Sequence, residues 1–321
     1  MKIQYTRSQF AKLLGFTDKQ LKAADKLPEL KALGGGRDSY QLPLLSAYRR
    51  VLDRHPHREP LRRQLFLNFK GGTGKTSLSV AYAFRLAEMG HRVLLIDLDS
   101  QGHATQHLGV AGENLQRTVY DTLVSGVPID DVILPTPLEE FDVLPANLRM
   151  TTIDISLMPM AGREYKLQRA LARVTDRYEF IVMDAPPSFG LLNLNALMAT
   201  DDLLVPVLPD FLSFHGLKLL FETLGQLEDD LNHRLQRIKI VINQYNPTTR
   251  IAREAKGALE SHYREFLSDT IVRQCTQFAR ASSDGLPINA YAPSSKGARD
   301  IDALITEMMS ARFERAMERS A

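Results

Sequence analysis

The chain has 321 residues, of which 44% are hydrophobic and one, Cys275, is a cysteine. This length suits one sizeable α/β domain with a small accessory module, and a lone cysteine excludes an internal disulfide framework and suits a reducing cytoplasm. The net charge of +2 conceals a division, because residues 1–63 hold 14 basic against 6 acidic side chains, whereas residues 64–321 hold 26 against 32. A basic head of this kind favours contact with polyanions. Neither a membrane span nor a signal peptide is expected, because no apolar stretch is long enough for either.

Residues 1–55 form the first predicted unit, a small helical module. Residues 8–14, Gly15 and residues 17–21 have the spacing of a helix, a glycine turn and a second helix, which is typical of a helix-turn-helix. Residues 37–40 and the apolar segment after them resemble the wing and following helix of MerR-like domains. The alternative is a small helical dimerisation module. The DNA contacts predicted for the module are Lys19, Lys22 and Arg37.

Residues 56–63 contain two prolines and no apolar period, and they are predicted to be a linker. From residue 64 to residue 321, apolar runs alternate with helical patterns. Strands are expected at 64–68, 92–97, 141–144, 180–184, 203–207 and 238–242, and helices at 75–89, 163–175, 190–199, 214–230, 250–266 and 300–320. Because continuous apolar runs suit parallel strands covered on both faces, this pattern predicts an α/β domain with a doubly wound, mostly parallel sheet.

A glycine-rich segment lies between the first strand and the first helix of this domain, with the sequence Lys70-Gly71-Gly72-Thr73-Gly74-Lys75-Thr76-Ser77. Such a turn can cradle phosphate, because its backbone N–H groups converge on phosphate oxygens. Lys75 is placed to reach the β- and γ-phosphates, and the Thr76 hydroxyl is placed to bind Mg²⁺. Phe69 stands where the common pattern has its first glycine, and Lys70 adds a second lysine.

Polar side chains follow three further strands. Asp97 and Asp99 come after the second strand, Asp184 ends the fourth, and Asn243 follows the sixth. The carboxyl ends of parallel strands line the ligand crevice of an open sheet, so these side chains are expected near the glycine-rich segment. Carboxylates there suit a metal shell or the orientation of a water, and an amide can match both a donor and an acceptor on adenine. For Asn243, a turn before Pro247 is the alternative.

These segments together resemble the ParA/MinD family of deviant Walker ATPases, and most of all its ParA-type partition proteins. The matching segments are the loop at 70–77, the D-x-D motif at 97–102, the D-x-P-P motif at 184–187, the N-A-L at 195–197 and the late G-x-P-I…S-K-G pattern at 285–297. The resemblance covers the chain from about residue 64 onward. Ser100 and His103 depart from the family pattern, which has proline and asparagine there.

The resemblance implies an ATPase that uses ATP and Mg²⁺ and forms a homodimer when ATP is bound. It implies that Lys70 crosses to the partner's nucleotide, that Lys75 neutralises phosphate charge and that Asp99 positions the attacking water. The residues implied to hold the nucleotide are Gly71, Gly72, Thr73, Gly74, Lys75, Thr76, Ser77 and Asn243. Those implied to serve Mg²⁺ are Thr76, Asp184 and Asp97, with support of the loop as the alternative role of Asp97.

The resemblance also implies non-specific binding of double-stranded DNA by the ATP dimer of a cytoplasmic, nucleoid-associated protein. A ParB-like or adaptor protein would stimulate hydrolysis, and the task would be plasmid or chromosome partition or cargo positioning. The alternatives are a nucleotide-tuned transcriptional repressor acting through residues 1–55 and a MinD-like membrane switch acting through the final helix. The mixed charges of that helix favour packing on the sheet, and no membrane contact is expected. The predicted phosphate contacts of the ATPase domain are Arg250, Arg253, Lys256, Arg273 and Arg280.

Overall fold

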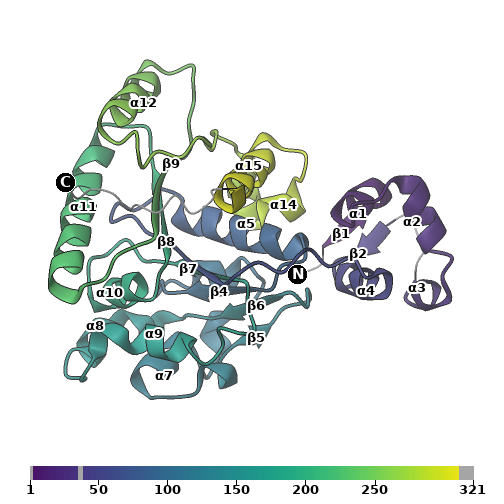
Figure 1. Ribbon diagram of the computed structural model, residues 1–321, viewed down its shortest axis with the longest axis horizontal. Helices are drawn as coiled ribbons and strands as arrows, with labels where there is room; N and C mark the ends of the chain where they lie inside the picture. Colours follow the sequence, from purple (N-terminus) through teal and green to yellow (C-terminus); the bar gives the residue numbers. More distant parts are fainter. Residues whose placement is uncertain (1–2, 35–38, 311–321) are drawn as a thin grey trace, which may run out of the picture.

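The structure, a computed structural model, describes residues 3–34 and 39–310 (Figure 1). Its larger part is a seven-stranded sheet with the order β5-β6-β4-β7-β3-β8-β9, in which every neighbouring pair is parallel except β5–β6. The strands are β3 Arg62–Phe66, β4 Val93–Asp97, β5 Leu134–Pro135, β6 Phe141–Leu144, β7 Phe180–Asp184, β8 Asp202–Val207 and β9 Arg237–Ile242. The predicted α/β fold with a mostly parallel sheet is therefore confirmed.

The central strands divide their side chains between two cores, one on each face of the sheet. In β4, Leu94 and Ile96 enter one core, whereas Val93 and Leu95 enter the other. Because both faces are covered, these strands are apolar at nearly every position, which is why they appear in the sequence as continuous runs. All six expected strands are present, and the two-residue β5 is too short to produce such a run.

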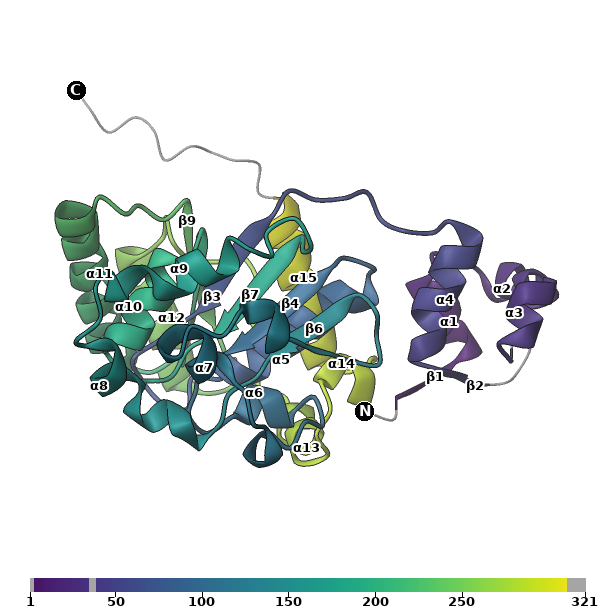
Figure 2. The ribbon, with the colours of Figure 1, turned by 90° about the horizontal axis from the view of Figure 1, so that it is seen from below.

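Helices cover both faces of the sheet (Figures 1 and 2). The core beneath α5, α14 and α15 lies on one face, and the core beneath α7, α8, α9, α10 and α11 lies on the other. The helices are α5 Lys75–Glu88, α6 His103–Gln106, α7 Val119–Val124, α8 Ile153–Leu157, α9 Lys166–Leu171, α10 Leu191–Met198, α11 Leu212–Leu231, α12 Arg250–His262, α13 Gln277–Ser283, α14 Ile288–Tyr291 and α15 Lys296–Ser310. The expected final helix is present as α15, and its part beyond residue 310 lies outside the described residues. None of the helices described is long and apolar enough to cross a membrane.

The N-terminal lobe, residues 3–34 and 39–52, lies beside the sheet domain on the side away from α11 and α12 (Figures 1 and 2). Its elements are β1 Gln4–Thr6, α1 Arg7–Leu13, α2 Asp18–Ala24, α3 Pro28–Ala32, β2 Ser39–Gln41 and α4 Pro43–Leu52. The expected order of helix, glycine turn and helix is present. Gly15 has a positive φ of 68°, and the Thr17 hydroxyl accepts from the Gln20 N–H at 3.3 Å to cap α2.

The lobe has an aromatic core of its own. Phe10 stacks on Tyr40 with ring centroids 4.4 Å apart and meets Tyr48 edge-on at 5.1 Å. Both tyrosine hydroxyls donate to the buried Asp25 carboxylate at 2.7 Å. The two hydroxyls and the carboxylate brought into this core therefore satisfy one another, as burial requires.

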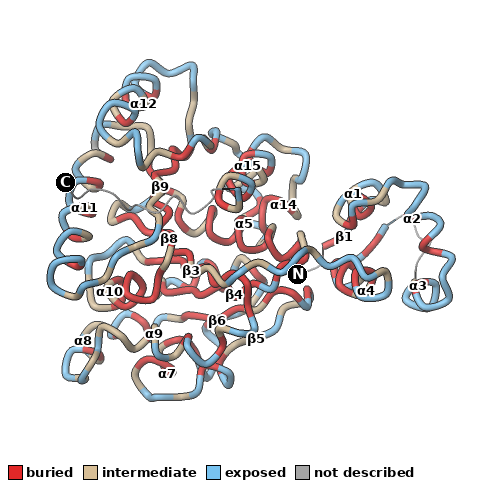
Figure 3. The backbone as a smooth tube through the Cα atoms, viewed as in Figure 1, coloured by how far each residue is buried: buried red, intermediate tan, exposed pale blue. Residues whose placement is uncertain are grey.

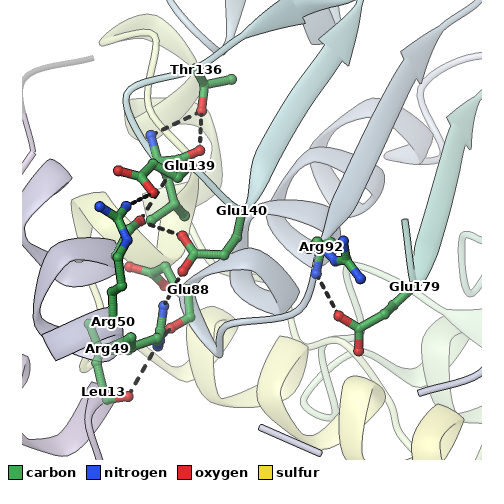
Figure 4. Close-up of polar contacts among 11 residues, drawn as sticks. Leu13, Arg49, Arg50, Glu88, Arg92, Thr136, Glu139, Glu140 and Glu179 are labelled. Carbon is green, nitrogen blue, oxygen red and sulfur yellow. Dashed lines mark hydrogen bonds and ion pairs between the residues drawn. The ribbon is translucent and has the colours of Figure 1, made fainter. Parts of the chain in front are cut away.

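The lobe is fixed to the sheet domain through buried polar contacts (Figure 4). Arg49 of α4 is 1% exposed, donates to the Glu88 carbonyl at the end of α5, and lies 3.6 Å from the Glu140 carboxylate. Tyr5 donates to the Glu88 carboxylate at 2.5 Å, and Ser46 donates to Glu140. Because α5 begins at the glycine-rich loop and ends at Glu88, the lobe contacts the end of α5 farthest from that loop.

Residues 53–61 connect the lobe to β3 and contain no helix or strand. Arg62 and Arg63, expected in the linker, belong to β3. The connection is tied to the sheet domain by Glu179, whose carboxylate accepts from the Glu59 N–H at 2.9 Å. Partial burial opposes ionisation of Glu179, yet its bonds to His91 and to the Arg92 and Glu59 amides lower its pKa to about 2.

Candidate nucleotide site

The glycine-rich loop connects the end of β3 to the start of α5. Gly72 and Gly74 have positive φ angles of 73° and 89°, which glycine adopts without strain. The first N–H groups of α5 have no helical acceptor and are available to an anion, as a phosphate loop requires. Lys75 is buried, and its Nζ lies 3.2 Å from the Lys70 carbonyl. Burial lowers the pKa of Lys75, and the charges of two nearby carboxylates oppose the shift.

Asn243, at the end of β9, lies directly against this loop. Its Nδ2 donates to the Thr73 carbonyl at 2.7 Å, and its Oδ1 accepts from the Gln244 N–H at 2.8 Å. A Cβ at Gly74 would collide with this amide, so the glycine is required for close packing as well as for its backbone angles. Asn243 thus braces the loop. The contact of Asn243 with adenine remains a prediction. The second hydrogen of its amide nitrogen and the second lone pair of its oxygen leave room for that contact.

A cavity of about 430 Å³ adjoins the loop on the Asn243 side. Its wall includes Gly74 and Ser77 from the loop and start of α5, and Gln274, Cys275 and Phe278 from the segment around α13. This volume is within the usual range for ligand pockets, and its mixture of apolar and amide groups suits a nucleobase. Gln274, Cys275 and Phe278 carried no site prediction from the sequence, whereas Arg273, which also lines the cavity, was predicted to contact DNA.

Asp184 is the buried carboxylate best suited to a metal ion. Neither of its oxygens has a hydrogen-bond partner of good geometry. Burial, helped by the charge of Asp97, raises its pKa to about 8, and the Thr76 and Ser79 hydroxyls and Lys75 oppose the shift. An orphaned carboxylate beside the Thr76 hydroxyl fits Mg²⁺, which takes one or two protein oxygens and completes its shell with water and phosphate. The described residues hold no group of three or more His, Cys, Asp or Glu side chains that could bind a metal ion.

Asp97 has a different environment from Asp184, although the two are partners in adjacent strands. Its Oδ2 accepts from the Thr105 N–H and hydroxyl at 2.8 and 2.7 Å, and its Oδ1 accepts from the Asp99 N–H at 3.1 Å. Both oxygens therefore hold the loop after β4, and Oδ1, which accepts one bond, has one lone pair left for a metal ion. Asp99, placed by this loop, is partly exposed, and its Oδ1 accepts from the Gln101 N–H at 3.0 Å.

Lys70, the additional lysine of the loop, is held by a residue that the sequence reading missed. Its Nζ lies 2.9 and 2.7 Å from the two carboxylate oxygens of Asp210. Partial burial opposes ionisation of Asp210, but Lys70 and Ser213 lower its pKa. Asp210 follows the end of β8, so the rule that drew attention to the other strand ends would have found it as well.

The predicted DNA contacts of the sheet domain are not equally free. Arg250 pairs with Glu254, Lys256 pairs with Glu260, and Arg253 donates to the Pro247 carbonyl. Arg273 donates to both oxygens of Asp300, with its shortest contact at 2.6 Å, and so joins the segment before α13 to α15. Arg280 is exposed and has no ion pair in the described part of the chain. Of these five, Arg280 is therefore the most available to a phosphate, and Arg273 would first have to leave Asp300.

The lobe presents its lysines to solvent. Lys19 and Lys22 of α2 are exposed, and neither has an ion pair in the described part of the chain. Lys26 and Lys31 are exposed in the same way. Arg37, the third predicted contact of the lobe, lies outside the described residues. The order of helix, glycine turn and helix is thus present, whereas the MerR-like helix-turn-helix module and its DNA contacts remain predictions.

Comparison with known proteins gives concordant matches. A family model described as an AAA domain, AAA_31, matches residues 64–237. The cell division protein PomZ of Myxococcus xanthus is 55% identical over 305 residues, which cover 95% of this chain and 92% of PomZ. The sporulation initiation inhibitor protein Soj of Bacillus subtilis is 36% identical over 231 residues, covering 72% and 91% of the two chains.

Solved structures with the same fold contain nucleotides. Cobyrinic acid a,c-diamide synthase from Mycobacterium smegmatis, with a bound ATP analogue and magnesium, has a TM-score of 0.66 at 28% identity and covers 79% of this chain and 98% of its own. MinD from Pyrococcus horikoshii, complexed with Mg-ADP, has a TM-score of 0.62 at 21% identity and covers 78% and 96%. The MinD likeness bears on the fold alone.

Proposed function

The chain belongs to the ParA/MinD family of P-loop ATPases, and from this membership we propose that it is an ATP-driven positioning protein. In this proposal Mg-ATP joins two copies, the dimer binds duplex DNA without sequence preference, and a ParB-like or adaptor protein stimulates hydrolysis and releases the dimer. The cargo is a division or partition complex. A cargo of that class is supported by the names of two relatives from Myxococcus xanthus: the cell division protein PomZ and the chromosome partitioning protein ParA, which is 33% identical over 242 residues.

The observation that carries the proposal is the position of Lys70. Its ammonium group lies at the rim of the phosphate loop, its side chain is 27% exposed, and Asp210 is its partner. Lys75 is placed to serve the phosphates from inside the loop, so a second lysine at the rim, which pairs with Asp210, is not needed for the phosphates of its own site. A second copy that covered this rim would bring its own nucleotide phosphates to Lys70. ATP would then act as the switch that makes the dimer.

The residues of the site divide the work of phosphoryl transfer to water. Lys75 and the loop amides bind the phosphates, and Thr76 and Asp184 hold the metal ion. Mg²⁺ supplies charge neutralisation between the β- and γ-phosphates when it is bound. Asp99 orients the attacking water, and Asp97 holds the loop that carries Asp99. Hydrolysis by this arrangement is slow until dimerisation and a partner complete it.

DNA binding is proposed for the exposed basic side chains of the sheet domain, with Arg280 as the first candidate. Contacts of this kind are salt-dependent and insensitive to sequence. The repressor alternative has one supporting observation, the unpaired lysines on and near α2, which is the helix that reads DNA in a helix-turn-helix. A membrane switch has less support, because α15 buries its apolar face, including Ile301, Leu304 and Ile305.

The test is binding to a non-specific DNA duplex at fixed moderate salt, with no nucleotide, with ADP and with ATP. We expect wild-type protein to bind only with ATP, Lys75→Ala to lose binding, and Asp99→Ala to retain it because hydrolysis no longer ends the bound state. Binding that ignores the nucleotide would contradict the switch and favour the repressor. Absence of binding in every state would contradict the DNA step as a whole.

A further inference from the structure

Thr105, the third residue of α6, is fully buried between the end of β4 and the segment after β6. Its N–H and its hydroxyl both donate to Asp97 Oδ2, and its Oγ1 accepts from the Ala146 N–H at 3.1 Å. We propose that Thr105 is a positioning residue for ATP hydrolysis, which fixes Asp99 by way of Asp97. The inference rests on the proposed function, because it assumes that Asp99 orients the attacking water.

A continuous chain of hydrogen bonds carries the effect. Thr105 occupies Oδ2 of Asp97, which leaves Oδ1 directed at the Asp99 N–H, 3.1 Å away. With both oxygens bound, the Asp97 carboxylate cannot rotate without breaking a buried bond to a charged group. The bond to the Asp99 N–H holds the Asp99 backbone at the end of β4, and the backbone in turn fixes the position of the Asp99 Cα, from which the side chain extends.

The hydroxyl of Thr105 has two simultaneous roles. It donates to Asp97 and accepts from Ala146, and among small side chains only threonine and serine can do both. Ala146 is itself closely packed by Gly102 and Gly112. A Cβ added to these glycines would come within 3.1 and 2.8 Å, respectively, of the Ala146 carbonyl oxygen. Thr105 therefore links the loop after β4 to a rigid support next to β6. Reacting groups depend on such support, since a displacement of about 1 Å can cost about 100-fold in rate.

The first test is steady-state ATP hydrolysis by Thr105→Val, which keeps the shape and loses the hydroxyl, and by Thr105→Ser, which restores it. We expect kcat to fall about tenfold or more in Thr105→Val, KM for ATP to change less than about twofold, and Thr105→Ser to stay near wild type. The matched control is Thr200→Val, because Thr200 is also buried and donates to the Ala196 carbonyl at 2.6 Å, at the start of β8. A kcat equal to that of the control, or a loss confined to KM, would overturn the proposal.

The second test needs no nucleotide. Hydrogen exchange of the peptide that covers residues 97–106 should be faster in Thr105→Val than in wild type, Thr105→Ser or Thr200→Val, because the Asp99 amide loses its fixed acceptor. Unchanged exchange would also overturn the proposal. Should Thr105→Val not fold, Thr105→Ala gives the same comparison without added bulk. If wild-type protein hydrolyses ATP no faster than Lys75→Ala, the proposed function fails, while the exchange result still decides whether Thr105 holds the loop.

Discussion

Asp184 combines full burial with two carboxylate oxygens that lack hydrogen bonds, and burial followed by the charge of Asp97 raises its pKa to about 8. Between about pH 4 and pH 8, Asp184 therefore keeps a proton in the folded protein that it has already lost in the unfolded chain, where its pKa is near 4. The stability from this linkage is full below about pH 4 and is lost as the pH rises to about 8. We predict that Asp184→Asn removes this slope. In the nucleotide-free state, the melting temperature of Asp184→Asn should exceed that of wild type. The difference should grow by a few degrees from pH 5 to pH 8 and then level off.

Calorimetric melting at several pH values, without Mg²⁺ or nucleotide, measures this difference. The same variant should lose the Mg²⁺-dependent part of nucleotide binding, since Asn lacks the charge that the metal requires. A constant gap between the two melting curves at all pH values would mean that Asp184 is not the group that titrates.

Asp210 competes for the lysine that the proposed dimer needs. Its oxygens hold Lys70 Nζ at 2.9 and 2.7 Å, and Oδ1 also accepts from the Ser213 N–H at 2.9 Å at the start of α11. Asp210→Asn keeps a capping oxygen and removes the charge, so Lys70 should be freed without loss of the helix start. Because partly exposed ion pairs are worth about 0–1 kcal/mol, we predict that half-maximal dimerisation requires about two- to fivefold less non-hydrolysable ATP.

Light scattering during a nucleotide titration measures this shift. Lys70→Ala is the matched control, because it should weaken the ATP dimer whether or not Asp210 is present. If Asp210→Asn dimerises at the wild-type concentration or above it, the ion pair does not restrain Lys70.

The elements that the sequence predicts well are those with a long pattern. The six apolar runs became six strands because burial on both faces leaves a continuous signal, and the helices of α5, α11 and α12 followed from their period. α6 has four residues, little more than one turn, so no period could reveal it. The importance of Thr105 was hidden for the same reason, since it depends on a short helix turning back on β4.

The residues of the candidate site also differ in how far the sequence could predict them. The end-of-strand rule located Asp97, Asp99 and Asp184, because topology alone brings parallel strand ends together. The partners of charged residues could not be read in this way. Lys70 and Asp210 are 140 positions apart, and Arg273 and Asp300 are 27 apart, so only the folded chain pairs them. The sequence could therefore indicate candidate groups for the chemistry, but not the contacts that restrain or occupy them.

At the scale of the whole molecule, the structure joins a basic lobe to a mildly acidic domain through few contacts. Part of α4 is buried (Figure 3). Its Arg49 has the central place, because this side chain is buried between the Glu88 carbonyl and the Glu140 carboxylate (Figure 4). Burial lowers its pKa, and the carboxylates of Glu140 and Glu88 oppose the shift. This arrangement stabilises docking only while the guanidinium and the carboxylates are all present. A carboxylate buried in the interface without its partner would raise the free energy of the docked state.

We predict that Arg49→Met releases the lobe from the sheet domain. Removal of one partner from a buried ion pair costs about 3–5 kcal/mol, and undocking relieves that cost by returning Glu140 to water. The sheet domain should stay folded, because its two cores lie mostly outside this contact, while residues 53–61 lose their fixed course and become open to trypsin at Arg54 and Arg58. The matched control is Arg50→Met, because Arg50 pairs with Glu139 at the surface, where both side chains are at least 60% exposed. Limited proteolysis and the radius of gyration from X-ray scattering should both change in Arg49→Met and stay near wild type in Arg50→Met. Equal cleavage of the two variants would mean that the apolar contacts around α4, and not the buried guanidinium, hold the lobe in place.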